Sequence, residues 1–382
     1  MTRSGVRQER RLGELWRFFS RLGVSAFGGP AAHISLMEHE AVERRGWLTR
    51  ESFLDLVGAC NLLPGPSSTQ VAMALGYTRG GWPGLTVAGI CFILPASLAT
   101  LALAWAYVRY GHFPQVQGIL YGAKPVMLAV ILQAIWRLGR TALRKWWLAA
   151  LCVACLAAGL EGVPPLALLA ACGGLTALIA AARRSNEARV RGFTLLPAAG
   201  ASAGMAAAPG LLSILLVFLK LGAVVFGSGY VLLAFLQADL VDRLHWLTPN
   251  QLLDAVTAGQ VTPGPVFATA TFLGYLLHGF SGAAIATLGI FLPSFIMAGV
   301  VGALAAKMRK SSIAGAFLDG VNAAAIGLMA MVTIALGRAT LVDAFTWGLA
   351  LVCAAILVRW RVNATWLLAV GAVLGTIAHG WR

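Results

Sequence analysis

Two short segments of the sequence combine helix-breaking residues with polar side chains. Residues 61–66 read Asn-Leu-Leu-Pro-Gly-Pro and are followed by Ser-Ser-Thr-Gln at 67–70, and residues 260–265 read Gln-Val-Thr-Pro-Gly-Pro. Two prolines around a glycine remove backbone hydrogen bonds, so a helix that reaches either segment must break there. A helix that restarts after the break presents free N–H groups and the positive end of its dipole, which suits an anion. Each segment therefore predicts a broken helix that can hold an anion.

The polar side chains after the two breaks differ. The first break is followed by hydroxyl and amide side chains, whereas the second is followed by Val266, Phe267 and Ala268 before Thr269. A plainer interpretation is that serines and threonines at a break cap the freed backbone groups, and that a proline only kinks the helix. If the hydroxyls do bind a ligand, we expect the first break to carry more of the contacts.

Three cations lie where a membrane helix would have to contain them. Lys220 stands in the apolar run Leu215–Leu221, its counterpart in the first half is Arg21, and Lys124 lies in Gly-Ala-Lys-Pro. A charged side chain in such a run is costly unless it reaches the interface, pairs with an acid or faces a wet cavity. Snorkelling to the interface is the alternative for Lys220 and Lys124.

Acidic residues also recur at equivalent positions in the two halves. Asp55 and Asp254 are predicted in the first turns of their helices, where the dipole stabilises a carboxylate, and either could carry protons. The loop acids, which include Glu40 and Asp239, are expected to form ion pairs with Arg44 and Arg243. The predicted substrate-binding residues are Arg21, Gly28, Gly29, Asn61, Pro64, Gly65, Pro66, Ser67, Ser68, Thr69, Lys124, Lys220, Gly227, Ser228, Gln260, Thr262, Pro263, Gly264 and Pro265.

No cofactor or metal site is expected. The six cysteines are scattered through apolar runs, and the Cys-x-x-Cys at 152–155 has no charged neighbour that would lower a thiol pKa. The glycine motifs at 27–30 (Phe-Gly-Gly-Pro) and 226–229 (Phe-Gly-Ser-Gly) indicate either a second pair of breaks or points of close helix packing. These residue types alone do not separate the two interpretations.

The composition sets the class of protein that positions these residues. The chain has 382 residues, of which 59% are hydrophobic and only 11% charged, and its mean hydropathy is +0.80. Continuous apolar runs of about 20 residues are typical of a polytopic helical membrane protein rather than a β-barrel. The net charge of +15 comes from arginines in short loops, which the positive-inside rule explains without nucleic-acid binding. The basic amino terminus does not resemble a signal peptide.

Hydropathy divides the chain into two halves of six apolar segments. The expected segments are 14–36, 52–77, 84–108, 116–136, 146–160 and 164–182, then 211–236, 250–276, 282–306, 313–337, 340–358 and 364–380. The expected organisation is a basic disordered amino terminus (1–12), a first transport repeat (13–182), a basic linker with a possible extra crossing (183–210) and a second repeat (211–382).

The halves align residue by residue. Glu40, Arg44 and the Trp-Leu-Thr at 47–49 match residues 199 positions later, and after one deletion the offset becomes 198. The basic loops alternate between the copies. The loop after the third segment is the more basic in half two, and the loop after the fourth segment is the more basic in half one, where it contains Arg137, Arg140, Arg144 and Lys145. After the fifth segment half one has Glu161, whereas half two has Arg359 and Arg361. This alternation predicts two repeats of inverted topology, with the amino terminus in the cytoplasm.

Thr49 and Thr248 are predicted helix N-caps, and Thr248 with Gln251 forms a capping box. From Thr49, the residues before Pro64 rise about 21 Å at 1.5 Å each. The break therefore falls inside a hydrocarbon core of about 30 Å, where irregular backbone is tolerated only if it is covered by protein or lines a cavity.

The paired Phe-Gly-Gly-Pro, Trp-Leu-Thr, Pro-Gly-Pro and Gly-Tyr motifs resemble those of the chromate ion transporter family in its long, two-domain form. The resemblance is strong over 15–100 and 214–300. It implies a carrier that exports chromate across the inner (plasma) membrane of a bacterium and confers chromate resistance, with Gly28, Gly29, Pro30 and the Pro-Gly-Pro residues as hallmarks. Residues 228–229 depart from the pattern, so the two copies need not have equal roles.

Three other functions fit the residues in part. A carrier of sulfate or another small oxyanion would need the same donors and cations, because chromate and sulfate have nearly the same shape. A channel would conduct without saturation. A membrane enzyme that reduces chromate would need a flavin, a haem or a reactive thiol pair, for which the sequence has no motif. A homodimer is possible, and the lipid bilayer is the expected surrounding.

Overall fold

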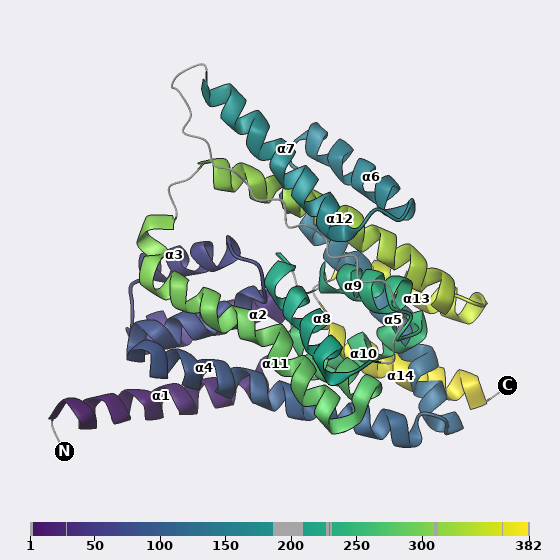
Figure 1. The fold of residues 1–382 in the computed structure, drawn as a ribbon. Helices are drawn as coiled ribbons and strands as arrows, with labels where there is room; N and C mark the ends of the chain where they lie inside the picture. The colour runs from purple at the N-terminus through teal and green to yellow at the C-terminus, as the bar shows by residue number, and fades with distance from the viewer. Residues whose placement is uncertain are drawn as a thin grey trace.

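The computed structural model describes residues 3–27, 29–185, 209–226, 229, 231–308, 312–360 and 362–380. Within these ranges the regular structure is helical (Figure 1). Five stretches are long and apolar enough to cross a membrane, which fits the expected polytopic membrane protein. They are Ser67–Tyr110, Pro114–Ala142, Pro165–Ala182, Val266–Val301 and Gly315–Thr340.

Each half contains one very long helix, of 44 residues in the first half and 40 in the second, among shorter ones. The first half comprises α1 (Arg3–Ser25), α2 (Gly29–Glu38), the π-helix η1 (His39–Arg44), α3 (Arg50–Asn61), α4 (Ser67–Tyr110), α5 (Pro114–Ala142), α6 (Trp146–Leu160) and α7 (Pro165–Ser185). The amino terminus, for which the sequence predicted disorder, is described from Arg3 onward as the first turns of α1.

The second half repeats this order. It comprises α8 (Leu211–Val224), α9 (Val231–Leu236), the π-helix η2 (Gln237–Arg243), α10 (Pro249–Val261), the 3-10 turn η3 (Val266–Ala268), α11 (Thr269–Met308), α12 (Ser312–Thr340), α13 (Ala344–Arg359) and α14 (Ala364–Gly380). The possible extra crossing at 192–210 falls almost wholly outside the described residues.

Backbone irregularities recur at equivalent places in the two halves. Gly81 in α4 and Gly279 in α11 have non-helical backbone angles that divide each long helix in two. Gly46 and His245, which follow the two π-helices, both have positive φ. His245 is a non-glycine residue in this unfavourable region, so the second copy keeps the conformation of the first even where the side chain does not favour it. The structure is therefore two copies of one fold.

The two copies interlock through their last helices. In Figure 1, α5 of the first copy lies beside α13 and α14 of the second, and α12 of the second lies beside α6 and α7 of the first. Glycines allow these helices to approach closely: a Cβ on Gly122 of α5 would lie 2.7 Å from the Cα of Gly375 in α14, and a Cβ on Gly320 of α12 would meet the backbone of Cys172 in α7. Such small residues let backbones approach within a membrane. Each copy therefore packs its later helices against those of the other copy.

Candidate functional site

The first break separates α3 from α4. Thr49 caps α3 by accepting a hydrogen bond from the Ser52 N–H, and the helix ends at Asn61. Gly65 has φ +115°, and a Cβ there would lie 2.6 Å from Gln70 Nε2 and 3.0 Å from Ser294 Oγ. Only glycine fits this position, because an L side chain would be strained and would clash.

The second break has the same construction. The capping box of Thr248 and Gln251 that the sequence predicted is present at the start of α10. After α10 ends at Val261, Gly264 has φ +96°, and a Cβ on it would lie 2.7 Å from the Cβ of Ala96 in α4. Both breaks predicted from the prolines therefore exist, and each faces the long helix of the other copy.

The glycine amides at the breaks bond to the opposite copy. The N–H of Gly65 donates to the carbonyl oxygen of Val225 at 2.6 Å, and the N–H of Gly264 donates to that of Ala26 at 2.9 Å. Val225 and Ala26 are counterparts, and each directly follows its helix, α8 or α1. The two amides thus hold the copies together. They lie before the helices that restart after the breaks, whose first N–H groups are the ones that the sequence predicted to be free for an anion.

The polar residues after the first break are buried and mostly occupied. Ser68 Oγ lies 3.4 Å from His33 Nδ1, and His33 Nε2 lies 3.1 Å from the carbonyl oxygen of Ala26. Gln70 donates to the carbonyl oxygen of Pro64. Thr69 Oγ1, by contrast, is fully buried without a hydrogen-bond partner in the described part of the chain. The sequence did not single out His33, which connects α2 to the first break.

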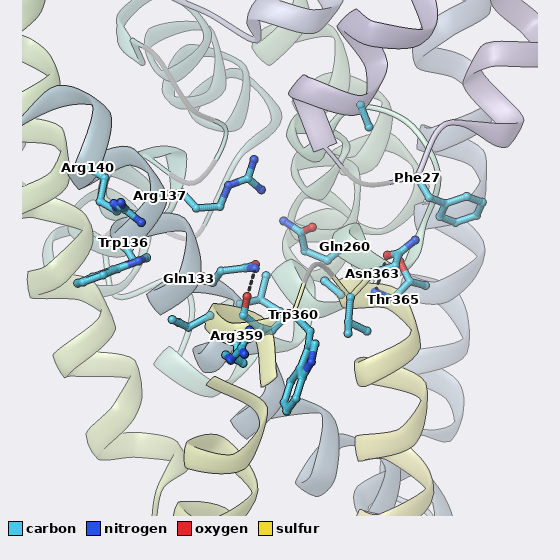
Figure 2. A pocket seen from close by; sticks show the side chains of 16 residues that line it. Phe27, Gln133, Trp136, Arg137, Arg140, Gln260, Arg359, Trp360, Asn363 and Thr365 are labelled. Carbon is cyan, nitrogen blue, oxygen red and sulfur yellow. Dashed lines mark hydrogen bonds between the residues drawn. The ribbon is translucent and has the colours of Figure 1, made fainter. Parts of the chain in front are cut away.

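A cavity of about 820 Å³ opens between the copies beside the second break (Figure 2). Three arginines face it and no acidic side chain does, among the described residues. Its lining is Phe27, Ala32, Val130, Gln133, Trp136, Arg137, Arg140, Gln260, Leu357, Val358, Arg359, Trp360, Val362, Asn363, Ala364 and Thr365. We call this the basic cavity. It is large enough for a hydrated anion and has the charge to attract one.

Helix geometry explains how the basic cavity is lined. Gln133, Arg137 and Arg140 recur at the four- and three-residue spacing of one face of α5. Gln133 Nε2 donates to the carbonyl oxygen of Leu357 at 2.8 Å, which fixes the end of α13 against this face. Gln260, from the motif of the second break, has a buried Nε2 without a partner among the described residues. An unpaired buried donor is costly, and a ligand oxygen would satisfy it.

The sequence predicted Gln260 but not the arginines. Arg137, Arg140 and Arg359 were assigned only to basic loops. Their register with Gln133 on one helix face was a signal that could have identified the first two. Nothing in the sequence indicated that the α13–α14 connection, which brings Arg359, Asn363 and Thr365, would lie next to α5.

The predicted cations have different positions. The Arg21 side chain is exposed. Lys220 Nζ lies 2.7 Å from Asp239 Oδ2, and Arg243 also pairs with this carboxylate at 3.2 Å. Lys124 Nζ lies 3.1 Å from Asp254 Oδ1 in a buried ion pair. The two lysines are therefore paired with acids.

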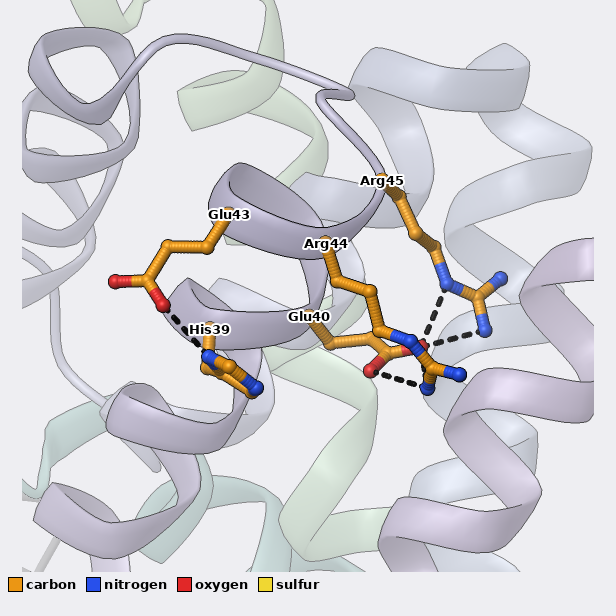
Figure 3. Close-up of polar contacts among 5 residues, drawn as sticks. All are labelled: His39, Glu40, Glu43, Arg44 and Arg45. Atoms are coloured by element: carbon orange, nitrogen blue, oxygen red, sulfur yellow. Dashed lines mark hydrogen bonds and ion pairs between the residues drawn. The ribbon is translucent and has the colours of Figure 1, made fainter.

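The loop acids form the expected ion pairs. Glu40 lies 3.2 Å from Arg44 and 2.7 Å from Arg45 (Figure 3). In the second copy Asp239 pairs with Arg243. The predicted ion pairs of Glu40 with Arg44 and of Asp239 with Arg243 are therefore both present.

The remaining predicted residues are dispersed. Asn61 is exposed and Asp55 is partly buried. Gly29 has φ +79° at the first residue of α2. Thr262 Oγ1 lies 3.2 Å from Thr100 Oγ1 of α4. Ser67 is buried at the start of α4. Pro64, Pro66, Pro263 and Pro265 form the two breaks. Gly28, Gly227 and Ser228 lie outside the described residues. No group of three potential metal ligands lies together in the described part of the chain.

Comparison with known proteins supports a transport role. The chromate transporter family model matches residues 13–177 and again residues 212–376, that is, once in each half. A chromate transport protein of Cupriavidus metallidurans is 33% identical over 96% of this chain and 93% of its own length. A chromate transport protein of Pseudomonas aeruginosa is 32% identical over 96% of this chain and 91% of its own. A probable chromate transport protein of Synechococcus elongatus is 31% identical over 92% and 91%.

No solved structure matches the chain. The family model covers most of both halves, and the relatives align from end to end. The resemblance drawn from the paired motifs is thereby confirmed. The chain belongs to the chromate transporter family.

Proposed function

We propose that this protein is a secondary transporter that exports chromate from the cytoplasm across the inner membrane and so confers chromate resistance. The observation that carries the proposal is the basic cavity between the two copies, with three arginines and no acid in its described lining. A tetrahedral dianion needs cations and several N–H or O–H donors. Arg137, Arg140 and Arg359 supply the cations, and Gln260 and Thr365 add polar groups.

The position of the cavity favours entry from the cytoplasm. Arg137 and Arg140 lie near the end of α5, directly before the basic connection that contains Arg144 and Lys145. Clustered Arg and Lys residues mark the cytoplasmic side of a membrane protein. An anion drawn from the cytoplasm would thus meet the arginines first, as export requires. The inside-negative membrane potential then favours outward movement of the anion.

The symmetry of the breaks supports alternating access. Each Pro-Gly-Pro glycine bonds to the residue that directly follows the first helix of the other copy, so movement of one copy against the other would change both breaks together. Transporters made of inverted repeats move in this way around a site at broken helices. In this mechanism the buried hydroxyls near the first break, including Thr69, would be available to the anion in a second conformation.

A carrier of sulfate or another small oxyanion is the second candidate. The basic cavity favours a tetrahedral dianion, yet none of its polar groups distinguishes chromium from sulfur at the centre of the ion. The two substrates must therefore be compared directly by transport.

The test is uptake of chromate into inverted membrane vesicles, with sulfate as competitor. We expect saturable uptake that an imposed potential drives. Arg137→Gln removes a cation from the basic cavity and is expected to lower uptake at low substrate concentration at least tenfold. Arg144→Gln removes the same charge from the adjacent connection, where the side chain is exposed outside the cavity. It is the matched control and should keep uptake within twofold of the unmodified protein.

The outcomes separate the alternatives. Strong sulfate uptake with little chromate uptake would favour the sulfate carrier. Conduction that does not saturate would indicate a channel. No flux of either ion above empty vesicles, with protein present at normal level, would contradict transport of these oxyanions. Equal loss of uptake in both arginine variants would show that the general positive charge matters and that the basic cavity is not the binding site.

A further inference from the structure

A buried ion pair connects the two copies away from the basic cavity. Lys124 on α5 and Asp254 on α10 lie 3.1 Å apart, and their side chains are only 18% and 3% exposed. The Tyr107 hydroxyl of α4 donates to the other carboxylate oxygen at 2.9 Å. Three helices from both copies therefore meet at one carboxylate. A buried pair of this kind costs desolvation and needs a reason other than stability.

The ion pair and the basic cavity are lined by different parts of the same two helices. On α5, Gln133 follows Lys124 by nine residues, about 14 Å at 1.5 Å per residue. On α10, Asp254 is in the first half and Gln260 is the penultimate residue. Because Lys124 contacts Asp254 while Gln133 and Gln260 share the cavity, α5 and α10 run side by side in the same direction. Lys124 is the next cation along α5 from the cavity, toward the start of the helix.

This arrangement is confined to one of the two copies. The counterpart of Asp254 is Asp55, but the counterpart of Lys124 is Asn322 and that of Tyr107 is Ala305. The combination of an aspartate, a lysine and a tyrosine at these three positions is thus present in the sequence once, and its counterpart positions hold an aspartate, an asparagine and an alanine. A purely structural contact of the duplicated fold would be expected in both copies, so the asymmetry points to a role in function.

We propose that the substrate dianion and Asp254 compete for Lys124, so that a proton binds Asp254 when the anion takes its place. This inference rests on the proposed function and adds to it the coupling ion. A proton from solvent neutralises the carboxylate, Lys124 is released, and its ammonium group pairs with the oxyanion. One proton then moves with each dianion. The complex keeps a net negative charge, which the inside-negative potential still drives outward.

Two neighbouring side chains control the protonation of Asp254. In the described part of the chain, Lys124 from α5 and Tyr107 from α4 are the titratable groups in contact with Asp254. Lys124 supplies the charge for which anion and carboxylate compete. Tyr107 donates to the ionised form of the carboxylate and therefore opposes its protonation.

The test is sulfate binding to the purified protein in detergent, measured as a function of pH together with proton uptake by a pH-indicator dye in weak buffer. Sulfate is the probe because it stays a dianion across the range, whereas chromate itself protonates near neutral pH. We expect sulfate to bind more tightly as the pH falls, with affinity changing by up to about tenfold per pH unit where one proton is taken up.

Three variants distinguish the groups. Asp254→Asn should bind sulfate with an affinity that no longer changes with pH and should take up no proton. Tyr107→Phe removes a donor to the carboxylate, so its pH dependence should move to higher pH. Asp55→Asn is the matched control in the other copy and should keep the pH dependence of the unmodified protein.

The outcomes separate this inference from the proposed function. Sulfate binding without proton uptake in the unmodified protein overturns the inference but leaves oxyanion transport in place. Unchanged pH dependence in folded Asp254→Asn also overturns it. If that variant does not fold, the shift in Tyr107→Phe decides the matter, since an unshifted profile would exclude Asp254 as the proton site. Absence of sulfate and chromate binding at every pH would instead contradict the proposed function.

Discussion

The N–H of Gly65 donates a hydrogen bond to the carbonyl oxygen of Val225 in the other copy, and the N–H of Gly264 returns an equivalent bond to Ala26. The two donors are counterparts in the repeat, and so are the two acceptors. Each break is therefore closed by the copy to which it does not belong. Irregular backbone at this depth needs protein partners for its polar groups, and here the duplicated fold supplies them reciprocally.

The two break glycines should not tolerate a side chain. Gly65→Ala and Gly264→Ala place a Cβ at positive φ and within 2.6 Å and 2.7 Å of a neighbouring atom. We expect each substitution to lower the free energy of unfolding by about 1–3 kcal/mol, the range for a strained backbone residue. The measurement is the melting temperature in detergent.

Gly58→Ala is the control for these two variants. Gly58 lies within α3, where an added Cβ meets nothing within 4 Å. Alanine is the better helix former by about 1 kcal/mol, so this variant should be as stable as the unmodified protein or more stable. Equal destabilisation by Gly58→Ala would mean that the loss at the breaks does not depend on their geometry.

Substitution of Asp239 should destabilise the protein more than substitution of Lys220. Lys220→Met leaves Arg243 to pair with Asp239, and Lys220 is 40% exposed, so we expect a loss of only about 1 kcal/mol. Asp239→Asn leaves both Lys220 and Arg243 without this partner and should cost more. The double variant should be less destabilised than the sum of the two, which a double-mutant cycle of melting temperatures measures.

Sulfate affinity decides whether Lys220 also serves the substrate. If its ammonium group contacts the anion in another conformation, as the sequence predicted, Lys220→Met should weaken sulfate binding tenfold or more in protein that is still folded. If affinity stays within twofold, the lysine acts through Asp239 alone.

Glu40 should make stability depend on pH. Burial acts to raise the pKa of its carboxyl, but the hydrogen bonds and charges of Arg45 and Arg44 outweigh burial and lower the pKa below its ordinary value. A lowered pKa in the folded state adds stability above the unfolded pKa of about 4.3. That stability is lost as the pH falls through the folded pKa.

The measurement is the melting temperature of the unmodified protein and of Glu40→Gln across this range. Near neutral pH the unmodified protein should melt at a higher temperature than Glu40→Gln. This difference in melting temperature should shrink as the pH falls. Glu161→Gln changes an exposed carboxylate at the end of α6 and should follow the unmodified protein. A difference between Glu40→Gln and the unmodified protein that persists unchanged at acid pH would contradict the assignment.

Local chemistry explains which features the sequence could predict. Caps at Thr49 and Thr248 and breaks at the prolines depend on residues close in sequence, and all were found. The pairs of Glu40 with Arg44 and of Asp239 with Arg243 are one helical turn apart, so they too follow from spacing. The duplication was visible because both copies keep these local signals.

Features that depend on helix packing could not be predicted in the same way. Lys124 and Asp254 are 130 positions apart, and their pairing requires α5 of one copy to lie against α10 of the other. The basic cavity requires α13 and α14 to cross onto α5. Hydropathy identifies such helices as apolar but does not predict which helices pack together, because lipid and protein are similarly apolar surroundings.

Gln260 and its counterpart Asn61 should differ in how much they contribute to sulfate binding. Gln260 lines the basic cavity with a buried Nε2 that has no partner among the described residues, so an anion oxygen can accept its hydrogen bond. Gln260→Leu should weaken sulfate binding about tenfold, the loss expected for one hydrogen bond to a charged group. Asn61→Leu changes the same class of side chain where it is exposed outside the cavity and should change affinity less than threefold. Equal losses in the two variants would mean that both breaks contact the anion, and that the basic cavity alone does not define the site.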